Sequence, residues 1–145
     1  RLTGFYRACD ELGLEIPEEY VREGVYHDPD RCAELTQELL KLEVPPTCIL
    51  MPDDISSIGG GNAIRRMGFR LPGDVSAAGY DGIQLSSVMN PPLTTYRQDT
   101  QALGKTAAAK LIELIEKPRT ALVDRILIPG RLVEGASVQA IEPQE

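Results

Sequence analysis

Two short runs of mostly apolar residues constrain the fold of this 145-residue chain more than any other feature. Thr47–Met51 ends two residues before Asp53, and Val75–Tyr80 is followed at once by Asp81. Such runs are typical of strands that are buried on both faces of a parallel sheet. Parallel strands need long crossover connections, usually helices, and open α/β sheets bind ligands beyond the carboxyl ends of their strands. The two runs therefore predict an α/β fold with aspartates at its ligand-binding edge.

The first part of the chain carries two helical patterns. Apolar residues recur at helical spacing from Phe5 to Leu12, and Gly13 supplies a C-terminal stop. Asp28 followed by Pro29 predicts the N-cap and first residue of a second helix. That helix must end before Pro45–Pro46, because the residue before a proline disfavours the helical conformation.

The segment Ser56–Phe69, SSIGGGNAIRRMGF, contains three consecutive glycines. Each glycine costs about 1 kcal/mol relative to alanine in a helix interior, but the alternation of strands and helices still predicts a helix here. The run does not match a nucleotide-binding loop, because Ile64 stands where both common glycine motifs need glycine. We expect the glycines to let this helix pack closely against another surface.

The remaining expected elements are short, apart from one helix. We predict a strand and loop over Tyr20–Tyr26, an extended piece over Leu93–Tyr96, and closing strands at Arg125–Ile128 and Arg131–Val133. A helix is predicted from about residue 99 to residue 116. It carries a stripe of four apolar side chains: Leu103, Ala107, Leu111 and Leu114.

Charge and composition exclude several classes of function. The formal net charge is −7, which leaves no basic patch for a nucleic-acid backbone. The three cysteines are widely spaced and His27 is the only histidine, so a disulfide framework and a zinc site are not expected. Free thiols fit a reducing cytosol, and no apolar run approaches the length of a membrane span.

The sequence offers little evidence of catalytic residues. The serines have no plausible base except His27, and none lies in a GxSxG elbow, so we predict no enzyme. Asp53 and Asp54 could hold a divalent cation, but an N-cap with one outward carboxylate is the better interpretation, and we predict neither metal nor cofactor.

Tyr26, Asp53 and Asp81 remain as a candidate ligand site, since each is expected at the carboxyl end of a strand. Carboxylates accept hydrogen bonds from neighbouring hydroxyls, and an aromatic ring can cover the apolar face of a sugar. The three residues suit a polyol, although composition alone equally allows unrelated turn and cap residues.

Several segments resemble one family. LPGDVSAAGYDG and NPPLTTYRQD closely resemble the effector domain of the lactose-repressor/galactose-repressor family of bacterial transcription regulators. Four further segments resemble the same domain in the same order: RLTGFYRACDELGL, PDDISSIGGGNAIRRMGF, QALGKTAAAKLIELIE and ILIPGRLVEGASV. The resemblance implies that residues 1–145 form part of the second lobe of a domain like a periplasmic binding protein. That lobe would be a three-layer α/β unit, with helices on both faces of a mainly parallel sheet. The first lobe, on which helix 99–116 would pack, and the helix-turn-helix module are expected outside this chain.

The resemblance also implies an effector site. Arg1 falls on an effector-binding arginine, Tyr26 on an aromatic position of the cleft, and Asp81 on an effector-binding aspartate. Asp53 stands where the family commonly has the asparagine of an Asn-Asp pair, and Asp54 is the second member. Aspartate lacks the donor of asparagine, so this change either alters ligand choice or leaves the position unused.

Finally, the resemblance implies a homodimer formed by the helix after Asp54 and by the loop from Ile83 to Met89. The residues expected at the interface are Ile58, Gly61, Ile64, Arg65, Ile83, Leu85, Val88 and Met89. The expected function is that of a cytoplasmic regulator that couples a sugar or sugar derivative to operator affinity. A transport-binding protein of the same fold, monomeric and exported, is the alternative.

Overall fold

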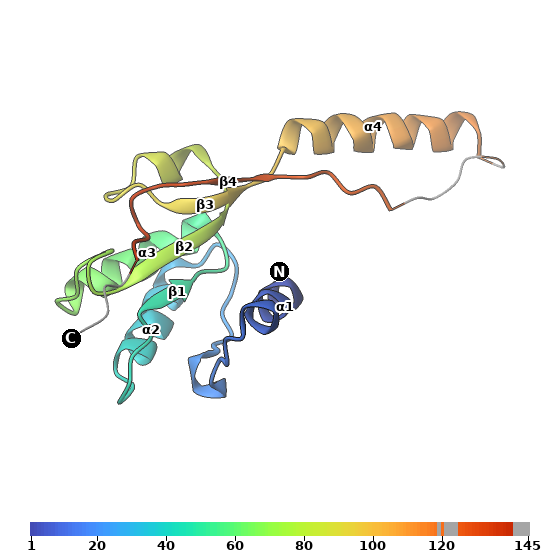
Figure 1. Ribbon diagram of the computed structural model, residues 1–145. Helices are drawn as coiled ribbons and strands as arrows, with labels where there is room; N and C mark the ends of the chain where they lie inside the picture. Colours follow the sequence, from blue (N-terminus) through green and yellow to red (C-terminus); the bar gives the residue numbers. More distant parts are fainter. Residues whose placement is uncertain (119, 121–124, 141–145) are drawn as a thin grey trace.

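The computed structural model describes residues 1–118, 120 and 125–140 (Figure 1). The helices are α1 (Leu2–Leu12), α2 (Pro29–Leu40), α3 (Asp54–Arg66) and α4 (Thr100–Glu116), with 3₁₀ turns η1 (Glu18–Tyr20) and η2 (Gln84–Ser87). The strands are β1 (Cys48–Leu50), β2 (Ser76–Asp81), β3 (Thr94–Arg97) and β4 (Arg131–Val133). They form one sheet in the order β1-β2-β3-β4. The first three strands are parallel and β4 is antiparallel to β3, so the predicted α/β fold with a mainly parallel sheet is confirmed.

Local signals in the sequence set the ends of the first two helices. Gly13 ends α1 in the left-handed conformation, with φ of 66°. Asp28 caps α2, because its carboxylate accepts a hydrogen bond from the backbone N–H of Arg31 at 2.9 Å, and Pro29 is the first helical residue. Both predicted boundaries are confirmed.

The triple glycine lies inside α3, where it brings this helix close to α2. A Cβ atom on Gly59 would overlap the carbonyl oxygen of Pro29, and one on Gly60 would overlap the thioether end of Met51. A Cβ on Gly61 would meet only Leu71 Cδ2, at an ordinary 3.5 Å. Gly59 and Gly60 therefore serve close packing of α3 against its neighbours, as the sequence predicted, whereas Gly61 does not.

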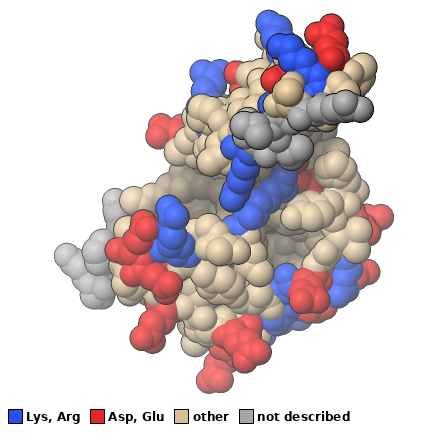
Figure 2. All heavy atoms as spheres, turned by 90° about the vertical axis from the view of Figure 1, so that its right-hand side faces the viewer, with Lys and Arg blue, Asp and Glu red and all other residues tan. Residues whose placement is uncertain are grey.

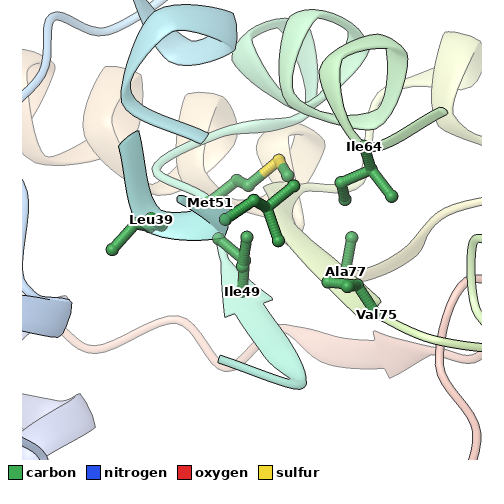
Figure 3. Close-up of a cluster of buried hydrophobic side chains, with 7 residues drawn as sticks. Leu39, Ile49, Met51, Ile64, Val75 and Ala77 are labelled. Carbon is green, nitrogen blue, oxygen red and sulfur yellow. The ribbon is translucent and has the colours of Figure 1, made fainter. Parts of the chain in front are cut away.

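The core lies between the sheet and the α2–α3 pair (Figure 3). Its buried side chains come from α2, β1, α3 and the start of β2, and they are Leu39, Leu40, Ile49, Met51, Ile64, Val75 and Ala77. This packing fixes the carboxyl ends of β1 and β2 relative to the first turn of α3, so residues that follow these strands have defined positions.

Two predicted strands are wrong. The segment Tyr20–Tyr26 begins at the end of η1 and then runs without joining the sheet, and Val25 is 63% exposed. Arg125–Ile128 also forms no ladder. In the register of β3 with β4, Arg97 lies opposite Arg131. Residues before Arg131 would therefore face the chain beyond Arg97, where α4 begins, so they find no strand partner.

Helix α4 extends away from the rest of the lobe (Figure 1). Asp99 caps it through a 2.9 Å hydrogen bond from the backbone N–H of Ala102. It contains no buried residue, and Leu111 and Ile115 are 59% and 69% exposed. The predicted helix is present, but Leu103, Ala107 and Leu111 of its apolar stripe are exposed and Leu114 is only partly buried. Its packing on a first lobe stays a prediction.

Candidate ligand-binding site

Asp81 ends β2 in an unusual backbone conformation. Its φ is 109°, in a region that residues other than glycine rarely adopt, and Gly82 follows with φ of 67°. Such a conformation costs about 1–3 kcal/mol and persists only where the surroundings enforce it. The carboxylate Oδ1 accepts hydrogen bonds from Arg1 Nη2 at 2.9 Å and from Gln98 Nε2 at 2.6 Å. Asp81 is thus held at the carboxyl edge of the sheet, where the sequence placed it.

Arg1 joins the two strand ends. Its Nη1 donates to the backbone oxygen of Pro52, just after β1, at 2.7 Å, while Nη2 bridges to Asp81. The guanidinium carbon lies 3.9 Å from the ring centroid of Tyr80 and 5.2 Å from that of Tyr26. Contact with the faces of two aromatic rings is favourable for a cation. It also fixes the plane of the guanidinium, whose remaining N–H groups are available to a ligand.

A cavity of about 430 Å³ lies beside these groups, lined by Arg1, Tyr26, His27 and Asp81. Three of the four predicted ligand-binding residues are therefore brought together. Tyr26 is 60% exposed, so its ring is open to a bound molecule.

On the face in Figure 2, basic and acidic side chains are mixed and several basic ones lie beside a hollow, so this face carries no continuous basic surface.

His27 is a cavity residue that the sequence analysis did not assign to the site. Its backbone is left-handed, with φ of 57°, and its N–H donates to Asp53 Oδ2 at 3.0 Å. The turn-prone sequence His27-Asp28-Pro29 indicated a chain reversal, but nothing local showed that His27 would line the same cavity as Arg1 and Asp81. That position depends on contacts between distant parts of the chain.

Asp53, the fourth predicted residue, does not line the cavity. It is fully buried as the N-cap of α3, and its two oxygens accept from the N–H of Ser56 at 2.8 Å, the hydroxyl of Ser56 at 2.8 Å and the N–H of His27. Burial favours the neutral acid, but the hydrogen bonds from Ser56 and His27 outweigh it and lower the pKa of Asp53. Its carboxylate holds the cavity loop to α3.

Asp53→Asn should destabilise the protein by about 1–2 kcal/mol near pH 7. The amide has one acceptor oxygen fewer than the carboxylate, and its NH₂ group would point at the donors on Ser56 or His27. The folded-state pKa of Asp53 lies below its ordinary value of 3.8. The stabilisation by the carboxylate is therefore complete above about pH 4 and is lost as the pH falls through the folded pKa. Urea denaturation at pH 7 and pH 3 should show the gap between wild type and variant shrinking at pH 3. A gap that is the same at both pH values would contradict this role.

The residues predicted at a dimer interface separate into two groups. Gly61 and Ile64 lie inside the lobe, and Ile64 is 0% exposed in the core. Leu85 and Val88 are 45% and 72% exposed. The others are partly or fully exposed: Ile58, Arg65, Ile83 and Met89. An interface formed by this surface would use the loop and the outer face of α3, without Gly61 and Ile64.

Two classes of feature are absent from the described residues. No three His, Cys, Asp or Glu side chains among them are grouped to hold a metal ion. Among the same residues, no helix combines the length and apolarity needed to cross a membrane.

Comparisons with known proteins agree with this architecture. Residues 1–138 match the model of the periplasmic binding protein-like domain family. The transcriptional repressor PurR of Mannheimia succiniciproducens is 36% identical over 141 residues, which are 97% of this chain and 42% of the relative. The Lac repressor dimer bound to operator and the anti-inducer ONPF has a TM-score of 0.86 at 30% identity, over 97% of this chain and 41% of that one. The regulator CelR in complex with cellobiose has a TM-score of 0.87 at 26% identity, over 94% and 41%.

The chain spans about two fifths of the length of such relatives, and these relatives are transcription repressors rather than enzymes or transport proteins. The match to the family model covers nearly all of the chain, in agreement with the α/β architecture of the sheet. The chain belongs to the periplasmic binding protein-like domain family, in the form found in repressors of the LacI and PurR type.

Proposed function

We propose that this chain is part of the effector-binding domain of a DNA-binding transcription regulator. It would bind a small molecule in the cavity beside Asp81 and pass the binding energy to a DNA-reading module. The relatives that match it are repressors, and the Lac repressor dimer was solved on its operator. The acidic chain itself, with a net charge of −7, offers no surface for DNA.

One observation carries the proposal: Arg1, Tyr26 and Asp81 come from distant parts of the sequence and converge on one cavity. Asp81 keeps a second carboxylate oxygen for hydroxyl donors, because the hydrogen bonds from Arg1 and Gln98 both use Oδ1. Arg1 adds donors beside the exposed ring of Tyr26. A ring with an apolar C–H face and hydroxyls at its edge, such as a sugar or sugar derivative, fits this combination of groups.

Asp53 supports the cavity indirectly. Its oxygens are already occupied by Ser56 and His27, so we assign it to positioning the loop rather than to direct contact. His27 replaces it as the fourth group that faces the effector.

A thermal-shift screen of the full-length protein tests the proposal. The compounds should include sugars, sugar phosphates, nucleobases and nucleosides. A compound at about 100 times its Kd should stabilise the folded state by about 2.7 kcal/mol. The same compound should change the affinity for genomic DNA fragments that the protein selects. If a compound binds but leaves DNA affinity unchanged, the regulatory role is wrong.

We also expect the full-length protein to be a homodimer through the loop from Ile83 to Met89. Val88→Asp should weaken dimerisation by about 3 kcal/mol or more, because it would bury an unpaired charge in the contact. Val44→Asp is the matched control, since Val44 is 66% exposed and Val88 is 72% exposed, but Val44 precedes β1. Light scattering should find a monomer for Val88→Asp and a dimer for Val44→Asp. A dimer for both variants would place the interface elsewhere.

A further inference from the structure

A buried carboxylate and a buried hydroxyl lie directly behind the strand end that carries Asp81. Asp54 and Thr95 are each 1% exposed, and Thr95 Oγ1 donates to Asp54 Oδ1 at 2.6 Å. Asp54 is the first residue of α3 and Thr95 lies in β3, so the pair joins α3 to the sheet.

The same pair accepts the two backbone N–H groups that follow Asp81. Thr95 Oγ1 accepts from Gly82 N at 3.3 Å, and Asp54 Oδ2 accepts from Ile83 N at 2.9 Å. Both N–H groups therefore depend on one hydrogen-bonded unit of two side chains. Within the described residues, neither N–H group donates to a backbone oxygen.

These hydrogen bonds restrain the backbone directly after Asp81, a residue in an unfavourable conformation. Asp81 has φ of 109°, and a residue keeps such a conformation only when the contacts around it enforce it. Anchoring the N–H groups of Gly82 and Ile83 fixes the peptide planes that follow Asp81. With these planes fixed, the Asp81 carboxylate stays beside Arg1 at the cavity.

We propose that Asp54 and Thr95 are positioning residues that hold Asp81 in its strained conformation and aim its carboxylate into the cavity. The proposal rests on the proposed function, because it treats Asp81 as an effector ligand. It adds that the site is shaped before any effector arrives, by a buried pair that touches no effector itself. The pair also anchors Ile83, the first residue of the loop predicted to form the dimer contact.

The test compares Thr95→Val with Thr95→Ser in the full-length protein without effector. Valine keeps the shape of the side chain but removes the hydroxyl, whereas serine keeps the hydroxyl. Crystal structures report the φ of Asp81 and its contact with Arg1. Amide hydrogen exchange reports the N–H groups of Gly82 and Ile83.

In Thr95→Val we expect Asp81 to leave its φ near 109° and to separate from Arg1. Exchange at Gly82 and Ile83 should accelerate about tenfold relative to Met51, whose N–H bonds to Ala78 in the same sheet. Thr95→Ser should behave as wild type.

Ser57→Ala is the control for a general loss of stability, because Ser57 is 1% exposed and donates its hydroxyl to Asp53 O at 2.7 Å. It should leave Asp81 in place. The proposal is overturned if Asp81 keeps its conformation in Thr95→Val, or if Ser57→Ala moves it equally.

Asp54→Asn provides a second variant in case Thr95→Val does not fold. The amide cannot accept from both Thr95 and Ile83, so exchange at Gly82 or Ile83 should still accelerate, and unchanged exchange at both would count against the pair. None of these measurements uses an effector. If the cavity binds no compound, the proposed function is refuted. The role of Asp54 and Thr95 is still decided by these measurements alone.

Discussion

Gly59→Ala is expected to destabilise the protein by about 3 kcal/mol or more, at the upper end of the usual cost of overpacking. The new Cβ would overlap the carbonyl oxygen of Pro29. That oxygen belongs to the backbone of the first turn of α2, which the Asp28 cap fixes, so no flexible side chain can move aside. The two helices would have to separate, and the core beneath them includes Leu39 and Ile64.

Gly61→Ala is the matched control, two residues further along the same helix. Its Cβ would meet only Leu71 Cδ2 at 3.5 Å, so alanine should stabilise the protein by up to about 1 kcal/mol through its higher helix propensity. Urea denaturation of the two variants should shift the midpoint in opposite directions. Equal midpoints would show that α2 and α3 do not pack as described.

Asp81→Ala should weaken effector binding by about 1.5–3 kcal/mol, the cost of a lost hydrogen bond to a charged group. The variant also removes the partner of Arg1 Nη2, so the guanidinium loses one of the two bonds that orient it. Asp74→Ala is the control. Asp74 pairs with Arg70 in the turn before β2, at the opposite end of the strand from Asp81.

Calorimetry with the compound that gives the largest thermal shift measures both variants. Asp74→Ala should bind as wild type does. If Asp81→Ala binds equally well while remaining folded, Asp81 is not an effector ligand.

The features that the sequence predicted correctly are those set by neighbouring residues. Asp28 and Pro29 define the start of α2, Gly13 ends α1, and the alternation of apolar runs and helices indicated a mainly parallel sheet. The α3 helix was predicted against its own glycine content, because the elements around it required a crossover.

The features that could not be predicted from the sequence depend on contacts between residues that are far apart in the chain. The segment over Tyr20–Tyr26 is apolar enough for a strand, yet no described strand lies beside it. Asp53 was predicted to bind the ligand, but both of its oxygens accept hydrogen bonds from His27 and Ser56. Local propensity contains no information about such contacts.

The same reason explains the residues that were missed. His27 lines the cavity, and its N–H donates to Asp53, 26 residues away in the sequence. Thr95 meets Asp54 across 41 residues, so no local pattern could mark either as part of the support for Asp81.

The central claim is that an effector occupies the cavity between Tyr26, His27, Arg1 and Asp81. A crystal structure of the full-length protein, with the compound that gives the largest thermal shift, tests it most directly. We predict that the compound lies against the ring of Tyr26, with a hydroxyl or N–H donor within hydrogen-bond distance of the Asp81 carboxylate. A compound bound elsewhere, with this cavity containing only solvent, would contradict the account.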